Sequence, residues 1–408
     1  MVEIALTTGL AAFMGITAYW RASLLDSVIY SNEANGYRTT NMWFDGDIPK
    51  YVFIATDRHA NQHSVLSEHP FVSAAIYPPV FLLRKVAHVP TLPAIHLVWA
   101  VYAALWTSAL WILLRLRGCG SLDAAVFTAL GAVSAASMFW FAVPEVFSLG
   151  SLTIIVALCI AYAADRTRPT LAAYVLMNLV SMSMTASNWM LGIFAAIRDL
   201  PWRRAFTAIS GAFFLGWLLW LPEKALFPQA TFFLTASGRL TGFFYSPNLQ
   251  RSSDVVISLF SHTVVMPDLQ VAQSPGWQGL TAQLSSPIPS GVIGASAAAA
   301  WMALLGTGLV ASFKEARQSR VVRLVMLTLG AQLAMNLIFG RETFLYSMHF
   351  LPLLLVLVSS ITKTRFRGYG LGVALTAVVL VAVNNQLHYL EAVNFVSSVA
   401  RLVATPPG

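Results

Sequence analysis

The sequence predicts an all-α, polytopic membrane protein that forms one transmembrane domain over residues 1–408, with about ten or eleven spans. Of the 408 residues, 57% are hydrophobic and only 10% are charged. The mean hydropathy is +0.68. Apolar runs recur near the roughly 20 residues that cross a bilayer. Basic residues fall in the short links between these runs, which is typical of a multi-pass membrane protein.

The apolar runs define the predicted spans. One of them, 189–197, is too short for an ordinary span unless it is tilted or re-entrant. The others are 4–20, 92–114, 122–143, 146–164, 170–186, 205–222, 290–312, 322–340, 348–362 and 369–385. The positive-inside rule assigns the basic links between spans to the cytoplasm. The basic residues of these links are Arg115, Arg117, Arg166, Arg168, Arg198, Arg203, Arg204, Lys314 to Arg323, Lys363, Arg365 and Arg367.

The composition also argues against other classes of protein. The net charge is +8, but Lys and Arg do not cluster with stacking aromatic residues, so we expect no nucleic-acid partner. Cys119 and Cys159 have no metal-type spacing, and a disulfide framework is not expected. The run at 4–20 follows the acidic Glu3 and lacks a small-residue cleavage site, which predicts a retained helix rather than a signal peptide.

Two long segments, 21–91 and 223–289, fall on the external side in this topology and hold most of the acids and histidines. The end of the chain, 386–408, alternates apolar and polar residues and predicts an external amphipathic helix lying on the membrane surface. Charged side chains are nearly absent from the predicted spans. Because ion-coupled transporters keep some charges at mid-membrane for their work, this absence favours another activity.

The motif "FDGD" in the first external segment carries two candidate catalytic acids, Asp45 and Asp47, on either side of Gly46. In an extended backbone their carboxylates point to the same face. Such a pair takes a proton from an attacking hydroxyl, or holds a divalent metal such as Mg²⁺ or Mn²⁺ against a phosphate. An Asp-Gly turn with no chemical role is the alternative for an isolated pair.

Further ionisable residues follow in the same segment. His59 and His63 are four residues apart and would share a helix face, as in zinc-binding helices, but the adjacent Glu of that motif is missing. A solvated interfacial helix is the alternative. Glu68 and His69 begin the stretch "EHPFVSAAIYPP", which leads into apolar residues. We expect both side chains to contact a substrate.

This segment resembles the first external loop of GT-C-type glycosyltransferases, which include the protein O-mannosyltransferases and the aminoarabinose transferases of lipid A. In that family an acidic pair after the first transmembrane helix is followed by an "HPP" or "KPP" element. Here the matching elements are Asp45 with Asp47 and then "HPFVSAAIYPP". The family's acids are often adjacent, whereas Gly46 separates these two, so either could be the base.

Three other motifs fit the same resemblance. "AVPEVFSLG" places Glu145 at the external end of a span, "TASNWM" contributes Asn188, and "GRETFLYSMHFLP" contributes a further set. A guanidinium in that last motif suits phosphate oxygens, although an ion pair with Glu342 is the alternative. The second external segment adds arginines beside aromatic residues. The substrate-binding residues expected from these two regions are Arg239, Arg251, Arg341, Tyr346 and His349.

The resemblance implies a sugar donor on a polyprenyl-phosphate carrier and an acceptor hydroxyl on a lipid-linked glycan, a lipid or a protein. Asp45 or Asp47 would be the base, arginines would stabilise the departing phosphate, and direct displacement would invert the anomeric centre. The expected location is a bacterial inner membrane with the site facing the periplasm. A transporter or flippase of lipid-linked sugars, or a glycan polymerase or ligase, is the alternative.

Overall fold

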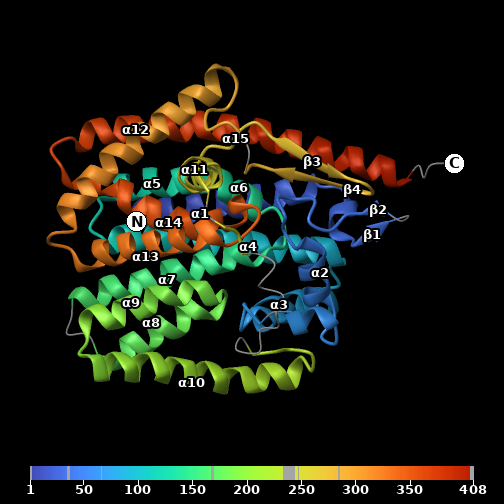
Figure 1. The fold of residues 1–408 in the computed structure, drawn as a ribbon, viewed down its shortest axis with the longest axis horizontal. Coiled ribbons are helices and arrows are strands. Elements are labelled where there is room, and N and C mark those ends of the chain that lie inside the picture. The colour runs from blue at the N-terminus through green and yellow to red at the C-terminus, as the bar shows by residue number, and fades with distance from the viewer. Residues whose placement is uncertain are drawn as a thin grey trace.

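The computed structural model describes residues 2–34, 37–65, 67–166, 170–232, 244–246, 248–283 and 285–404. The chain forms one bundle of helices, and the few strands lie at one end of it (Figure 1). In the described parts of the chain, seven helical segments are long and apolar enough to cross a membrane. This confirms the predicted all-α, multi-pass membrane protein.

These seven segments agree with predicted spans. They are α4 (Thr91–Leu116), α7 (Val146–Arg166), α10 (Trp202–Leu226), α12 (Gly291–Glu315), α13 (Arg320–Ile338), the segment Thr343–Lys363 around α14 (Ser347–Val358), and α15 (Arg367–Ala404). α13 ends at Ile338, and a short 3₁₀ turn, Thr343–Tyr346, leads directly into α14. The helices run side by side, so most apolar side chains of the segment Thr343–Lys363 are buried by their neighbours.

The other four predicted spans correspond to helices that are not among these seven segments. They are α1 (Val2–Ser23), the pair α5 (Ser121–Val133) and α6 (Ala135–Trp140), α8 (Leu171–Ser183) and α9 (Trp189–Asp199). The predicted span 122–143 is interrupted at Ser134, whose backbone is extended. There the amides of Ala135 and Ala136 bond to the carbonyls of Val264 and Thr263 instead of continuing the helix ladder.

The prediction of a separate surface helix at 386–408 is wrong for the described residues. α15 runs without a break from Arg367 to Ala404, 38 residues or about 57 Å of helix, which exceeds the roughly 30 Å of a hydrocarbon core. Its distal half is held against the bundle because Tyr389 is buried and its hydroxyl donates to the Arg21 carbonyl at 2.8 Å. Of the apolar residues in this half, Val396 and Val399 pack on the bundle, whereas Leu387 and Leu390 are exposed. Residues 405–408 lie outside the described chain.

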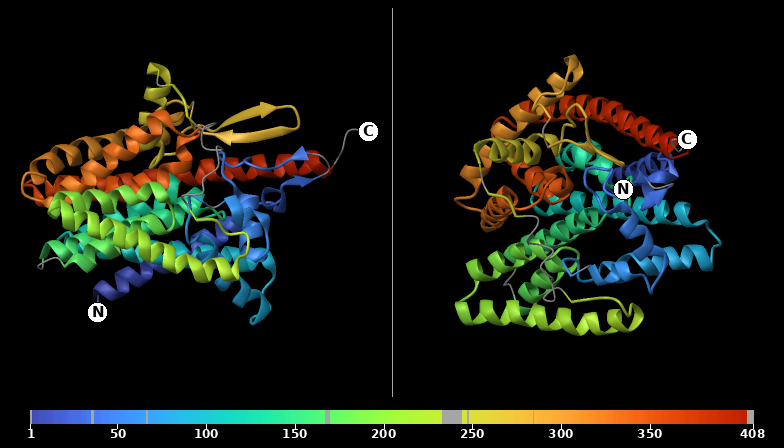
Figure 2. Two further views of the ribbon diagram at one scale, coloured as in Figure 1. Left: turned by 60° about the horizontal axis from the view of Figure 1, so that its bottom comes forward. Right: turned by 45° about the vertical axis from the view of Figure 1, so that its right-hand side comes forward.

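The two long segments predicted to be external, which we call the external segments, meet at one end of the bundle. In the first, β1 (Glu33–Ala34) and β2 (Tyr37–Arg38) precede α2 (Ile48–Thr56), a 3₁₀ turn (Asn61–Val65) and α3 (Val72–Lys85). The second contributes α11 (Leu249–Ile257), a π-helical turn (Ser258–His262), β3 (Gln270–Ser274) and β4 (Trp277–Thr281). The strand order is β1-β2-β4-β3, and only the β2–β4 pair is parallel, with Arg38 opposite Trp277. Figure 2 shows this sheet projecting from the bundle.

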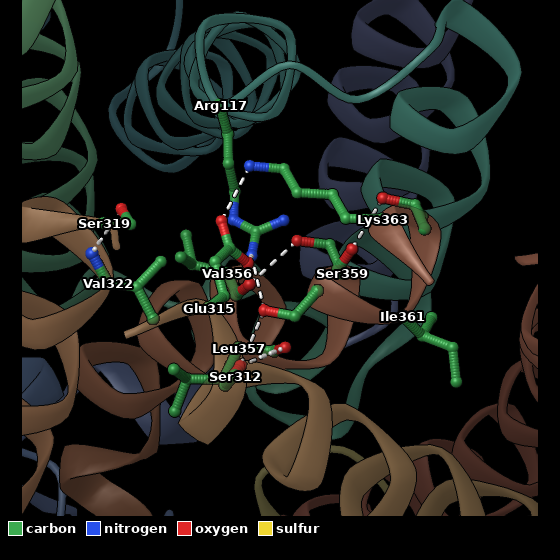
Figure 3. A network of polar contacts seen from close by, with 12 residues as sticks. Arg117, Ser312, Glu315, Ser319, Val322, Val356, Leu357, Ser359, Ile361 and Lys363 are labelled. Carbon is green, nitrogen blue, oxygen red and sulfur yellow. Dashed lines mark hydrogen bonds and ion pairs between the residues drawn. The ribbon is translucent and has the colours of Figure 1, made fainter. Parts of the chain in front are cut away.

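The opposite end of the bundle holds a network of charges around the buried Arg117 (Figure 3). The Arg117 guanidinium, at the end of α4, donates to Glu315 at the end of α12 at 2.5 Å. Lys363 donates to the other oxygen of the Glu315 carboxylate at 2.7 Å. Ser312 and Ser360 bond to each other at 2.7 Å beneath these charges. The network ties together the ends of three spans that are far apart in sequence.

The separation of the two ends predicts opposite labelling patterns across the membrane. In a variant whose two cysteines are replaced by Ala, single cysteines would be placed at the exposed positions His59, in the first external segment, and Arg317, in the link between α12 and α13. We expect an impermeant maleimide to label position 59 in intact cells and position 317 only after permeabilisation. Labelling of both positions from one side would contradict this arrangement.

Candidate active site

The "FDGD" motif forms a strained turn, residues 43–47, which we call the acidic turn. Asn41, Phe44 and Asp45 all have positive φ angles, at 62°, 48° and 60°. Residues with side chains avoid this left-handed region, and each costs on the order of 1 to 3 kcal/mol unless its surroundings impose it. Strain of this kind clusters at functional sites. The motif is therefore a turn, as the Asp-Gly alternative predicts, and its backbone is strained.

Aromatic packing imposes this conformation. Trp43 and Phe44 are fully buried and insert into the bundle. The Phe44 ring meets Phe344 edge-on at 5.0 Å between centroids and Phe139 at 5.5 Å. The backbone amide of Leu280, in β4, donates to the Met42 carbonyl at 2.8 Å. The second external segment therefore helps to hold the turn of the first.

Gly46 suits the acidic turn because its neighbours leave little room for a side chain. A Cβ atom there would lie 3.0 Å from the Trp43 carbonyl oxygen and 3.1 Å from the Trp140 ring. It would also lie 3.4 Å from a carboxylate oxygen of Glu145. The glycine between the two acids thus allows the backbone of the turn to approach the Glu145 carboxylate closely.

The two acids of the turn have different partners. Asn41 donates to Asp45 at 3.0 Å, and Lys50 forms an ion pair with Asp47. Burial raises the pKa of the Asp45 carboxyl, and the nearby Asp47 raises it too, against the lowering effects of the Asn41 bond and the Arg341 charge. A carboxylate with a raised pKa is a stronger base, so Asp45 has the more suitable environment for accepting a proton.

Glu145 is the buried support of the acidic turn. Its side chain is 1% exposed. One oxygen accepts the Asp47 amide at 2.9 Å, and the other accepts its neighbour's amide, Val146, at 2.8 Å at the start of α7. Burial and the Asp47 charge raise the pKa of Glu145 to about 8, although Lys50 and the two amides favour the ionised form. Glu145 therefore positions the turn rather than facing solvent.

His69 is buried near Lys50 and Asp47, and its contact with the Met184 carbonyl defines its tautomer. Burial, with Lys50 second, lowers the pKa of His69 to about 4, so the ring is neutral at pH 7. Its Nδ1 lies 2.8 Å from the Met184 carbonyl oxygen, which can only accept. Nδ1 therefore carries the proton and Nε2 is left as an acceptor. The carbonyl of the preceding Glu68 accepts the Ala186 amide at 2.8 Å, which fixes this part of the segment to the α8–α9 connection.

Two arginines, Arg251 in α11 and Arg341 after the end of α13, form what we call the basic wall, and the Arg341 charge acts on Asp45 of the acidic turn. Arg341 hydrogen-bonds to Tyr245, and this bond and the Asp45 charge raise the pKa of the guanidinium. Arg251 lies over the Tyr245 ring, 4.2 Å from its centroid, and donates to the Gly340 carbonyl at 2.5 Å. Both cations are therefore held on the same tyrosine. The expected contact residue Arg239 lies outside the described residues.

Glu342 does not pair with Arg341, so that alternative interpretation is wrong. Its carboxylate accepts hydrogen bonds from the Thr281 hydroxyl at 2.5 Å and from the Phe344 amide at 3.2 Å. Burial raises the pKa of Glu342 to about 7. Glu342 therefore caps the 3₁₀ turn before α14 and joins it to β4, which leaves Arg341 exposed and directed by Tyr245.

The remaining predicted residues lie directly beneath the acidic turn. The Phe147 ring is central, with its centroid 5.1 Å from Tyr346, 5.3 Å from His349 and 6.0 Å from His69. Asn188 is buried and donates to the Gly150 carbonyl at 3.2 Å. Except for Arg239, the predicted residues thus gather at one end of the bundle from five separate stretches of sequence.

The predicted pairing of His59 with His63 on a helix face is wrong. Residues 57–60 form turns, and His63 belongs to the 3₁₀ turn Asn61–Val65. His63 is buried, bonded to Ser73 at 2.8 Å and stacked on Phe227 at 4.9 Å. His59 is exposed. Neither a shared zinc site nor a solvated interfacial helix fits this geometry.

The fit of the predicted divalent metal is limited to Asp45 and Asp47. Within the ranges described above, no group of three or more His, Cys, Asp or Glu side chains is arranged to hold a metal ion. Lys50 also competes for the Asp47 carboxylate. Metal binding at Asp45 and Asp47 stays a prediction.

Several residues of the site are not among the sequence predictions. They are Asn41, Lys50, Phe147 and Tyr245. Lys50 has a signal in the sequence, because it stands three residues after Asp47 at the start of a helix, where opposite charges pair. Tyr245 is one of the aromatic residues beside arginines in the second external segment, whereas Phe147 has no such signal, since its role depends on contacts between distant segments.

A separate cavity of about 330 Å³ lies at the other end of the bundle, between α7, α8, α9 and α13. Its polar lining consists of Asp165, Tyr174, Arg198, Asp199 and Arg320. Arg198 is paired with Asp199 through two bonds of 2.7 and 2.5 Å. The cavity contains no residue of the acidic turn or the basic wall.

Comparison with known proteins gives no relative: the chain matches no family model, no curated protein and no solved structure.

The raised pKa of Glu145 predicts a pH dependence of stability. Because the pKa is about 8 in the folded chain and ordinarily 4.5, the folded state binds more protons between these values. Stability from this group is therefore present below pH 4.5 and is lost as the pH rises through 8. The slope is on the order of 1 kcal/mol per pH unit at most. We expect Glu145→Gln to lack this loss.

The measurement is thermal unfolding in detergent micelles from pH 5 to 9, followed by tryptophan fluorescence. The Tm of the wild-type protein should fall relative to that of Glu145→Gln between pH 5 and 8. Asp57→Asn, which changes an exposed acid of the same segment, is the control and should follow the wild-type profile. A difference between wild type and Glu145→Gln that stays constant over this range would contradict the assignment.

Proposed function

We propose that this protein is a membrane glycosyltransferase that moves a sugar from a polyprenyl-phosphate carrier to a hydroxyl group. The acceptor hydroxyl belongs to a lipid-linked glycan, a lipid or a protein. One observation carries the proposal. A strained turn with two acids lies near Arg341, whose charge acts on Asp45, at one end of an apolar helical bundle. A base and a phosphate-binding group side by side are what this transfer needs.

Asp45 is the proposed base. It accepts the proton of the acceptor hydroxyl while the acceptor oxygen forms a bond to the anomeric carbon of the sugar. The bond between that carbon and the phosphate oxygen breaks, and its electron pair stays on the carrier phosphate. Because attack and departure occur on opposite faces, the product has an inverted anomeric centre. The raised pKa of Asp45 supports this role.

The arginines are the proposed phosphate ligands. A guanidinium presents a planar fork of donors that matches phosphate oxygens and stabilises the charge that develops on the departing group. Arg341 is exposed and held by Tyr245, so it is oriented before a ligand arrives. Arg251 supports the same tyrosine and the Gly340 carbonyl. Asp47, paired with Lys50 and bonded through its amide to Glu145, positions the turn.

The apolar bundle supports a donor that enters from the membrane. A lipid-linked phosphate travels at the level of the lipid head groups, where the ends of the helices carry the acidic turn. We propose that the protein lies in a bacterial inner membrane with this end toward the periplasm. The partners are then the polyprenyl-phosphate sugar, the acceptor and the surrounding membrane lipid.

Purified protein given polyprenyl-phosphate sugars and candidate acceptors tests the base. Asp45→Asn should lower the rate of transfer by about 10²- to 10⁴-fold, the usual contribution of a general base. Asp47→Asn should lower the rate of transfer less, because Asp47 positions the turn and does not accept the proton. Asp57→Asn is the matched control in the same segment and should leave the rate unchanged.

Folding is checked in parallel through the melting temperature of each variant. Full activity in both Asp45→Asn and Asp47→Asn would contradict the proposal. Translocation of the lipid-linked sugar without transfer would instead favour a flippase. Extension of a glycan chain by repeated blocks would favour a polymerase or ligase.

A further inference from the structure

Beneath the acidic turn lies a group of uncharged polar side chains with unpartnered atoms, which we call the polar cluster. Its members are Thr185, Gln332, Asn336 and His349, around Gly150. The hydroxyl of Thr185, the amide oxygens of Gln332 and Asn336 and the Nε2 of His349 are buried and have no hydrogen-bond partner. All four side chains are at least nine-tenths buried.

Hydrogen bonds and close contacts join these residues into one site. Gln332 donates to Asn188 at 3.1 Å, and Asn188 donates to the Gly150 carbonyl at 3.2 Å. The absence of a side chain at Gly150 brings the other groups close. A Cβ atom at Gly150 would lie 2.6 Å from His349 Nε2 and 2.8 Å from Thr185 Oγ1.

Asn336 extends the polar cluster toward the basic wall. Its amide nitrogen donates to the Gln332 carbonyl at 2.8 Å, one helical turn away on the same face of α13. α13 ends two residues later, at Ile338, and Arg341 follows. Gly150 and Gln332 lie about four to six residues inside their helix ends, or roughly 6 to 9 Å at 1.5 Å per residue. The cluster is therefore just below the proposed reaction site.

A hydrogen-bonding ligand would offset the cost of leaving polar atoms unpartnered at this depth. A buried acceptor without a donor costs about 1 to 3 kcal/mol, and apolar surroundings provide no substitute. The four unpartnered groups are acceptors, or in the case of Thr185 and His349 can act as acceptors. None is charged. Such a set matches hydroxyl donors and not a phosphate, which needs positive charge or N–H donors.

We propose that the polar cluster is the subsite that holds the hydroxyl groups of the transferred sugar. This rests on the proposed glycosyl transfer and adds a division of labour to it. The basic wall takes the carrier phosphate and the polar cluster takes the sugar hydroxyls, while the Phe147 ring packs on His349 of the cluster and on Tyr346. Sugar recognition is thereby separated in space from lipid-phosphate recognition.

The test compares two ligands on the full-length protein in detergent micelles. One is polyprenyl phosphate, and the other is polyprenyl phosphate bearing glucose, mannose, galactose or arabinose. Affinity is measured by quenching of tryptophan fluorescence. We expect the wild-type protein to bind at least one sugar-bearing lipid more tightly than the bare lipid phosphate.

Thr185→Val removes one hydroxyl with little change of shape, and Gln332→Met removes the amide. Each should weaken binding of the preferred sugar-bearing lipid by roughly three- to tenfold, the effect of one hydrogen bond, and leave the bare lipid phosphate unaffected. Thr107→Val, a buried threonine of α4 whose hydroxyl already donates to the Ala103 carbonyl, is the matched control and should change neither affinity. A merely structural role would weaken both ligands together.

The outcomes separate the two proposals. Equal affinity for both ligands in the wild type, or unchanged affinity in Thr185→Val and Gln332→Met, would overturn the sugar subsite and leave water as the occupant of the polar cluster. Binding of the lipid phosphate would still support the proposed function in that case. Binding of neither ligand by the wild type would overturn the proposed function as well. Arg341→Ala should lower the affinity for both ligands equally. A loss of affinity for the sugar-bearing lipid alone would contradict the separation of phosphate and sugar recognition.

Discussion

The buried carboxyl of Glu145 is the contact on which the arrangement of the site depends. It accepts one amide from the first external segment, at Asp47, and one from the start of α7, at Val146. A long segment that enters from the membrane surface is thereby fixed to a transmembrane helix at its most strained point. Because Gly46 has no side chain, the backbone can approach this carboxyl closely. The two acids of the turn take their positions from this contact.

The second external segment completes the site by packing on the first. β4 pairs with β2, its Leu280 amide bonds to Met42, and Thr281 bonds to Glu342 before α14. These contacts place the Tyr245–Arg251–Arg341 group opposite the acidic turn. The site is thus assembled from loops, but each loop is anchored to a helix end. A rigid bundle with anchored loops is a common way to position reacting groups.

Much of the fold follows from the sequence because apolar length and the positions of basic links depend on local composition alone. The same local reasoning brings out Asp45, Asp47, Glu145 and Arg341, since ionisable residues are rare in this chain. It fails where a distant segment decides the structure. The break at Ser134 depends on carbonyls more than 100 residues away.

The wrong predictions have the same cause. The end of α15 continues the preceding span without a break and packs Tyr389 and Val396 on the bundle, although Leu387 and Leu390 are exposed. The spacing of His59 and His63 suggests a helix, but His63 is drawn into a pocket formed with Ser73 and Phe227. Spacing alone does not contain these contacts.

A structure of the protein with a bound polyprenyl-phosphate sugar tests the central claim most directly. The account predicts the phosphate within hydrogen-bond distance of the Arg341 guanidinium, with the anomeric carbon facing Asp45. A lipid phosphate bound instead at the opposite end of the bundle, in the cavity beside Arg198 and Arg320, would contradict it.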